Sequence, residues 1–420
     1  MFEAAVVMTR KWDAASAGEE IGKGIKEKLK NPPKFVLLFS TIHYEKYGGF
    51  QKFLDAVNKE LPEGTPVVGG TVAGFMNNYG CYTRGASAMA VYSDEMDVAV
   101  GVGHNTKRNP KKAAEECAGM INGKLTGSNY PNKHFVLFVS SAIVPTLPLV
   151  GNKKILKNIP FINQFLALFD IFSGHFQIGA GRDEAVLERF SELVPEFSGI
   201  GGASCDDLRL ERNTQFFGKE ILTNSIVSVA FAMNLEIQIS SKIGLTPTGK
   251  KLRITETSPS GYTIKKINNQ PAVAEYLKAM QWDPDILDER LYRKVFYYPL
   301  VQNVDGVKEP RMFGLVYGNN FVFPMKPVKN TELEIHNFSG ASLISSASNL
   351  VEKGPFSSGF LISCGTRLET LGSKIFSIKE KVFDKKFTGD YLVLYMAGEY
   401  EKEGGKRISC LYQSDNALLF

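Results

Sequence analysis

Two glycines and three polar residues form the first group that could bind a small molecule. Gly201 and Gly202 follow an apolar run, and Ser204, Asp206 and Asp207 come directly after them. Glycines let a ligand approach backbone N–H groups, which suits a carboxylate or a phosphate. The hydroxyl and carboxylate groups beside them could hold an ammonium group. The segment therefore offers contacts for both ends of an amino acid, unless Asp206 only caps a turn and the glycines only permit close packing.

A second group places a thiol near two charged side chains. Cys364 ends an apolar run, Arg367 follows it after two residues, and Glu399 comes after another apolar run. A guanidinium lowers the pKa of a nearby thiol and favours the reactive thiolate. A cysteine nucleophile also needs a base, and none of the five histidines shares a motif with Cys364. Cys364 could be structural, a ligand contact or reactive, while Arg367 and Glu399 could pair with each other or bind a zwitterion.

Composition narrows the class of protein. The 420 residues are 44% hydrophobic and 22% charged, which is a globular mixture, and no apolar run reaches the roughly 18 residues of a membrane-spanning helix. Five cysteines without a CxxC pair and five scattered histidines predict no disulfide framework, no metal site and no cofactor. The net charge of +5 is spread along the chain, so a nucleic-acid partner is not expected. The start has the acidic Glu3 where a secretory leader has a basic residue, and its apolar run is short and more typical of a strand, so a cytoplasmic protein is expected.

The elements that must position these residues alternate in type. The first hundred residues predict a β-α-β-α-β unit, with a helix that starts at the cap Asp13 and another over 50–60. Its strands are expected at 3–9, 35–41 and 66–70. Two further β runs, 84–93 and 97–103, are joined by so short a connection that they predict an antiparallel ribbon.

This unit recurs along the chain. Residues 35–41 return as 135–141, 68–71 return as 200–203, and 96–100 return as 235–239. The pattern predicts two duplicated subdomains, 1–106 and about 107–244. The offset grows from 100 to 132, which places about 32 extra residues in the second copy, within 142–183.

The insertion contains an apolar segment, 160–172, that follows several lysines. Its apolar residues cover nearly the whole circumference of a helix, so it must be covered by something. It could pack between domains, form a lid over a pocket, or dock on a second subunit or a membrane surface.

A second α/β domain is expected from about 245 to 420, after a linker at 244–250. It begins with a predicted hairpin over 252–257 and 262–267, followed by a helix over 271–280. The aromatic run at 294–299 could line a pocket or pack in the core. The predicted fold class is therefore mixed α/β.

Several motifs together resemble the FIST family, which has an N-terminal and a C-terminal part. The segment 198–207 and the ribbon from 214 resemble the N-terminal signature, whereas the first copy has Gly74 and Phe75 where acids are expected. Residues 359–372 and 395–399 resemble the C-terminal signature. The resemblance implies a sensory domain that binds a small molecule, with amino acids as the usual suggestion.

The preferred hypothesis is a sensory domain that binds a small polar ligand, such as an amino acid. The chain has no room for the signalling modules that often accompany the family, so output would pass through an unknown signalling protein or a homo-oligomer. One alternative is an enzyme that uses Cys364 with Arg367, which selective labelling of the thiol would favour. Another is an interaction scaffold that uses the apolar insertion to contact a partner or a membrane surface.

Overall fold

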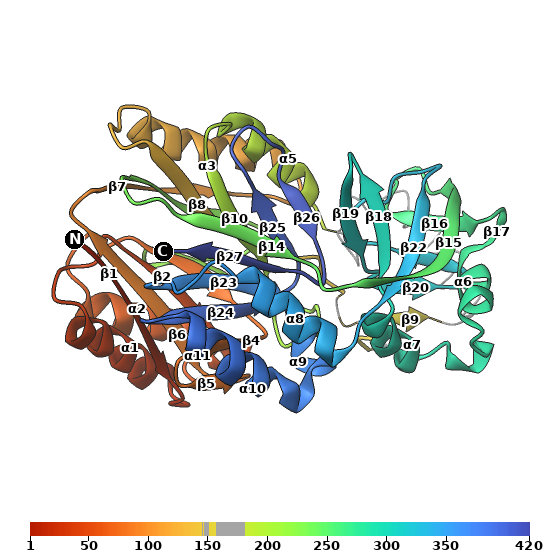
Figure 1. Ribbon diagram of the computed structural model, residues 1–420, viewed down its shortest axis with the longest axis horizontal. Coiled ribbons are helices and arrows are strands. Elements are labelled where there is room, and N and C mark those ends of the chain that lie inside the picture. The colour runs from red at the N-terminus through yellow and green to blue at the C-terminus, as the bar shows by residue number, and fades with distance from the viewer. Residues whose placement is uncertain (145, 147–150, 157–180) are drawn as a thin grey trace.

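The computed structural model describes residues 1–144, 146, 151–156 and 181–420. The predicted mixed α/β class is confirmed, because helices cover several mixed sheets. Figure 1 shows a larger body built from three of the sheets and a smaller module at its right-hand end. Most of the predicted insertion, including the apolar segment 160–172, lies outside the described residues. No helix in the described part of the chain is long and apolar enough to cross a membrane.

The first sheet follows the predicted β-α-β-α-β pattern. Helix α1 (Ala14–Lys28) begins at Asp13, whose carboxylate accepts the N–H of Ser16, and α2 (Phe50–Glu60) follows the second strand. Among the described strands of this sheet, β2 and β3 form the one parallel pair, as a helical crossover requires. The sheet order is β1 (Phe2–Thr9), β6 (Ala86–Ser93), β2 (Phe35–Ser40), β3 (Val67–Thr71), β11 (Gln215–Phe217) and β12 (Glu220–Leu222).

Two more sheets have the same strand order and the same directions. The second runs β7 (Met96–Gly103), β13 (Ile226–Met233), β8 (Asn132–Ser140), β10 (Ser198–Ser204), β25 (Glu399–Lys402) and β26 (Ser409–Leu411). The third runs β14 (Gln238–Lys242), β27 (Asp415–Leu419), β23 (Gly359–Cys364), β24 (Tyr391–Met396), β4 (Gly74–Asn77) and β5 (Gly80–Tyr82). Their helices are α3 (Pro110–Leu125), α5 (Asp183–Leu193), α8 (Gly340–Leu350), α9 (Arg367–Thr370), α10 (Ile375–Ile378) and α11 (Asp384–Lys386).

Each of the three units gives its hairpin to another sheet. The first unit's β4 and β5 complete the third sheet, the second unit's β11 and β12 complete the first, and the third unit's β25 and β26 complete the second. The three units are therefore joined by a cyclic exchange of hairpins. Internal duplication of the sequence itself stays a prediction.

The predicted ribbon between β6 and β7 is wrong. Both edges of β6 are already occupied, by β1 and β2, so no hydrogen-bonding edge remains for β7. The short connection instead crosses from the first sheet to the second, where β7 pairs with β13.

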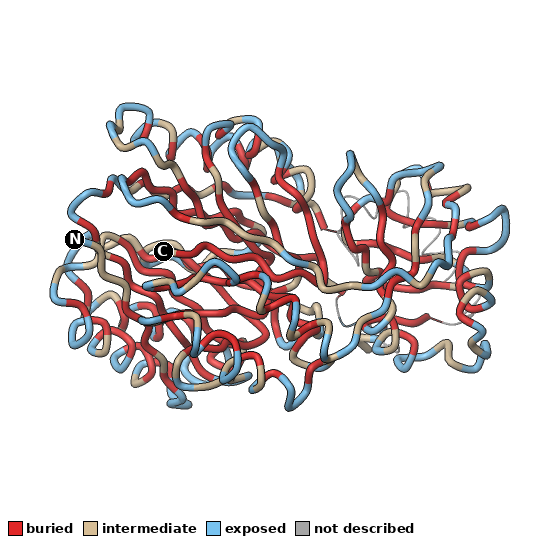
Figure 2. Tube along the Cα trace, viewed as in Figure 1, coloured by how far each residue is buried: buried red, intermediate tan, exposed pale blue. Residues whose placement is uncertain are grey.

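Apolar side chains from all three sheets meet in one core. Phe39 of β2, Phe138 of β8 and Phe360 of β23 contact one another there, with ring centroids 4.9, 5.9 and 6.4 Å apart. The helices cover the outer faces of the first and second sheets and bury two further clusters. Figure 2 shows this arrangement as buried strands inside an exposed outer layer.

The smaller module, residues 246–337, is inserted between β14 and α8. The predicted linker 244–250 belongs mostly to its first strand, β15, whereas the predicted hairpin of β15 with β16 and the helix α6 are confirmed. The elements are β15 (Thr246–Thr257), β16 (Thr263–Ile267), β17 (Gln270–Pro271), α6 (Ala272–Met280), α7 (Glu289–Lys294), β18 (Leu300–Val304), β19 (Val307–Arg311), β20 (Leu315–Tyr317), β21 (Asn320–Val322) and β22 (Glu332–Asn337). The short strand β9 (Ile155–Leu156) joins its sheet beside β20.

Candidate functional site

A cavity lies where the body meets the 246–337 module, and we call it the inner cavity. The space between its walls is about 570 Å³, which includes a part that is open to solvent. The body contributes Ser141, Cys364 and Ala397, which lie at or just after the carboxyl ends of β8, β23 and β24. Those ends belong to parallel strand pairs, and ligands in α/β proteins commonly bind at this edge of a sheet.

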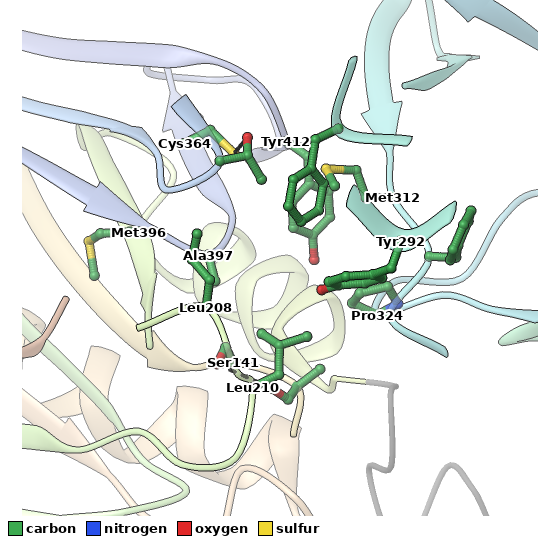
Figure 3. A pocket seen from close by; sticks show the side chains of 15 residues that line it. Ser141, Leu208, Leu210, Tyr292, Met312, Pro324, Cys364, Met396, Ala397 and Tyr412 are labelled. Atoms are coloured by element: carbon green, nitrogen blue, oxygen red, sulfur yellow. Dashed lines mark hydrogen bonds between the residues drawn. The ribbon is translucent and has the colours of Figure 1, made fainter. Parts of the chain in front are cut away.

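The module forms the opposite wall of the inner cavity. Tyr292 and Met312 lie across the space from Leu208 and Ala397 (Figure 3). Most of the lining is apolar, and Ser141, Thr366 and Cys364 are among its few polar groups. The cavity therefore suits a ligand with an apolar body.

Two polar cavities adjoin the inner one. The first, which we call the charged mouth, encloses about 920 Å³ of space that is partly open to solvent, and it shares Leu208, Tyr292 and Phe296 with the inner cavity. It is lined by three basic and three acidic side chains, namely Lys154, Arg209, Arg293, Asp207, Glu289 and Glu369. The second, the side cavity, lies after β2 and β3 and encloses about 760 Å³ of space that is partly open to solvent. Its lining includes Thr41, His43, Arg84, Leu208 and Leu368.

Gly201 and Gly202 lie inside strand β10, so the predicted turn at these residues is wrong. They pair with β8 on one side and with β25 on the other, which leaves no open turn for an anion. A Cβ on Gly201 would lie 2.7 Å from the Leu137 carbonyl oxygen, and one on Gly202 would lie 2.6 Å from Met396 Sδ. Close packing between strands and sheets accounts for both glycines.

Asp206 organises the loop that follows β10. Its carboxylate accepts the N–H groups of Leu210, Glu211 and Arg212 at 2.9, 2.8 and 3.3 Å. Burial raises the pKa of this carboxyl, and the N–H donors oppose that rise. These contacts are the ones expected if Asp206 caps a turn, which was the alternative to a ligand-binding role. The neighbouring Asp207 is exposed and faces the charged mouth and the side cavity.

Ser204 lies in the interior of the body. Its side chain is fully buried, and its Oγ has no hydrogen-bond partner in the described part of the chain. A Cβ built on Gly70 would lie 2.9 Å from this Oγ. Ser204 thus fills the space beside a glycine of the first unit and lines none of the three cavities described above.

Cys364 lines the inner cavity, but its thiol is not activated. Its Sγ lies 3.0 Å from Thr366 Oγ1. Burial raises the pKa of this thiol to about 12, and the Glu399 carboxyl adds to the rise. The expected lowering of the pKa by Arg367 is therefore wrong. No histidine is among the described residues that line this cavity.

Arg367 and Glu399 are buried behind the inner cavity rather than in it. Arg367 Nη2 donates to the carbonyls of Ile243 and Gln413 at 3.2 and 2.8 Å and lies 3.2 Å from Asp415 Oδ2. The Glu399 carboxyl accepts the backbone N–H of Gly398 and of Ser414, at 3.2 and 3.4 Å. Burial raises the pKa of Glu399 well above its usual value. The ion-pair partner of Arg367 is therefore Asp415 and not Glu399.

The structure thus divides the predicted site. Cys364 and Asp207 line the cavities described above, whereas the other predicted residues lie outside those cavities, in the interior, in strands or in the loop: Gly201, Gly202, Ser204, Asp206, Arg367 and Glu399. Within the described residues, no group of three or more His, Cys, Asp or Glu side chains is arranged to hold a metal ion.

Comparison with known families identifies the family of this chain. Residues 34–270, more than half of the chain, match the family model described as the FIST N domain. The chain belongs to the FIST family. This is a family of sensory domains, so a sensory role follows for this protein. The match ends at residue 270, before the C-terminal segments that resemble the family. No curated protein sequence matches the chain.

The main cavity-lining residues of this FIST protein are apolar and were missed by sequence analysis. Leu208, Leu210, Tyr292 and Met312 have the residue types of an ordinary core. The aromatic run at 294–299 was a partial signal, because its Phe296 lines the inner cavity. A second signal was available in Asp206, since a carboxylate that caps a loop implies that the loop has a fixed shape.

Proposed function

We propose that this FIST protein senses a small amphiphilic ligand that binds in the inner cavity with its charged end in the mouth. An amino acid with a large apolar side chain fits this description best. The observation that carries the proposal is that the body and the 246–337 module each form one wall of the same apolar cavity. A ligand there would contact both parts at once.

The two cavities match the two halves of such a ligand. The inner cavity offers apolar surface, while ionic groups would lose hydration there without full compensation. The charged mouth offers both signs, and two of its ion pairs are loose and exposed: Arg209 with Asp207 at 3.4 Å and Arg293 with Glu369 at 3.9 Å. Such pairs contribute little to stability, so they are available to a zwitterion.

A ligand between the body and the module would change how often the module occupies each of its positions relative to the body. A two-stranded ribbon joins them, in which Thr246 pairs with Asn337 and Pro247 with His336. A ligand that binds better to one arrangement of the module shifts the equilibrium towards it. A partner protein or a second copy of the chain would then read that arrangement.

A thermal-shift series with single L-amino acids tests this function. Leucine, methionine, phenylalanine and tyrosine should stabilise the protein, whereas glycine and alanine should not. At a concentration of about 100 times the dissociation constant, a ligand adds about 2.7 kcal/mol to the free energy of unfolding. A stabilisation of this size raises the melting temperature by an amount that is readily measured.

The substitution Ala397→Leu locates the ligand. It adds three heavy atoms to the wall of the inner cavity and should abolish the shift, whereas Ala15→Leu, on the exposed face of α1, should leave it unchanged. A series without any shift, or a shift that survives Ala397→Leu in a folded protein, would contradict the proposal.

A further inference from the structure

We infer that the Leu208 side chain is a gate that separates the inner cavity from the charged mouth and from the side cavity. It thereby limits which ligands reach the inner cavity. The inference deepens the function proposed above and rests on it for the identity of the ligand. Its geometric part, a side chain that separates three cavities, does not depend on any ligand.

Leu208 lies where the walls of the three cavities meet. Of the described residues that line the inner cavity, the charged mouth and the side cavity, Leu208 is the one that all three share. Figure 3 shows its side chain beside Ala397, with Leu210 below it. Truncation of this isobutyl group would join the three spaces.

The loop that carries Leu208 is held at both ends. Before it, the Cys205 N–H donates to the Thr71 carbonyl at 3.0 Å; after it, the Thr214 N–H donates to Thr71 Oγ1 at 3.0 Å. The Asp206 carboxylate fixes the N–H groups of residues 210–212. Leu208 therefore lies between fixed points, and a change at its own dihedral angles moves its side chain without unfolding the loop.

The backbone at Leu208 is strained. Its φ is 65°, and that of Leu210 is 58°, both in the left-handed region that side chains of this size avoid. Each such residue costs about 1–2 kcal/mol. A conformation of this kind persists only where the surroundings enforce it, which here are the contacts that hold the loop after β10.

Gly365 provides the place where the Leu208 side chain rests. A Cβ on Gly365 would lie 2.8 Å from Leu208 Cδ2 and 3.0 Å from the Met396 carbonyl oxygen. A methyl group there would push Leu208 away from its position. Gly365 does not itself require a left-handed φ, so any strain from Gly365→Ala comes from the contacts of the new methyl group with Leu208 and with the Met396 carbonyl, and not from its own φ.

The thiol of Cys364 reports on the gate without any ligand. Cys364 lines the inner cavity, so its alkylation by N-ethylmaleimide requires that the reagent reach this space. Leu208→Ala should increase the rate of labelling at Cys364 at least tenfold at one pH. Leu368→Ala is the matched control, because Leu368 is also half-buried but lines only the side cavity. It should label at the wild-type rate.

Two internal references separate opening of the gate from general loosening. Cys205 and Cys117 are buried and line none of the three cavities, so peptide mapping should show their rates unchanged. An unchanged rate at Cys364 in a folded Leu208→Ala protein would overturn the inference, and so would an equal increase at all three cysteines. If Leu208→Ala does not fold, Gly365→Ala replaces it. Faster labelling of Cys364 alone is then expected, and an unchanged rate at Cys364 or an equal increase at all three cysteines would overturn the inference.

The ligand series then tests selectivity. Opening of the gate should extend binding to amino acids with longer side chains, and the preferred side chain should lengthen in Leu208→Ala but not in Leu368→Ala. Faster labelling without amino-acid binding to any variant would uphold the gate and refute the proposed ligand. Amino-acid binding to the wild type with unchanged labelling and unchanged selectivity would refute the gate and leave the proposed function standing.

Discussion

The thiol of Cys364 and the carboxyl of Glu399 both have their pKa raised by burial. The Arg367 guanidinium opposes the rise at Glu399 without reversing it, and its Nη2 contacts two carbonyls and Asp415. The neutral form of the Cys364 thiol is therefore favoured near neutral pH, and burial disfavours the charged form of the Glu399 carboxyl. The back wall of the inner cavity is accordingly suited to the uncharged part of a ligand.

The first prediction concerns the reactivity of Cys364. With a pKa of about 12, its thiolate fraction at pH 7.5 is several hundredfold or more below that of an ordinary exposed cysteine. Alkylation should be at least a hundredfold slower than for a free thiol and should rise steadily between pH 7 and pH 10. The rate at Cys364 can be followed by mass spectrometry. A plateau near pH 7 would show an activated thiolate and revive the cysteine-enzyme alternative.

The second prediction concerns His134, which is 7% exposed at the start of β8. Burial lowers its pKa from 6.5 to about 4, so the unfolded chain binds a proton more readily between these values. Stability is present above pH 6.5 and is lost as the pH falls towards 4. Between pH 7.5 and pH 5 this loss is about 2 kcal/mol.

The substitution His134→Phe removes that contribution. In urea unfolding at both pH values, the difference in stability between variant and wild type should change by about 2 kcal/mol in favour of the variant at pH 5. Other titrating groups are common to both proteins and cancel in this comparison. A constant difference between the two pH values would show that His134 is not the group responsible.

At the scale of the element, the loop after β10 is the feature on which the cavities depend. Asp206→Ala removes the acceptor of three backbone N–H groups and should cost about 2 kcal/mol of stability. Hydrogen exchange at residues 210–212 should accelerate as the loop loosens. Asp207→Ala, at the adjacent exposed position, should change stability by less than about 0.5 kcal/mol. Equal effects of the two substitutions would contradict the role given to Asp206.

Local pattern predicted the elements better than it predicted their neighbours. Helix α1 and strand β2 are apparent in the sequence because capping and apolar periodicity are local properties. The partner of β7 is not local: it is set by the occupied edges of β6. In the same way, Gly201 and Gly202 suggested a turn, but contacts with other strands and sheets determine their presence. Cavity walls such as Leu208 and Met312 could not be distinguished from core by residue type.

At the scale of the whole molecule, the third unit was hidden by the module inserted in it. Residues 246–337 separate β14 from α8, so the repeat that the sequence shows for β7 and β14 leads into unrelated strands. The exchanged hairpins hide it further, since the first sheet needs β11 and β12 from a distant part of the chain. The two predicted N-terminal subdomains, 1–106 and 107–244, should consequently not fold as separate fragments.

Excision of the module tests the division between body and module. None of the three body sheets contains a module strand, and Thr246 pairs with Asn337, so a two- or three-residue Gly-Ser link can replace 246–337. The remaining body should still unfold in one cooperative transition, measured by circular dichroism. Because the module forms one wall of the inner cavity, its loss should expose Cys364 to rapid alkylation and abolish amino-acid stabilisation. A folded body that keeps the ligand response would place the binding site within the body alone.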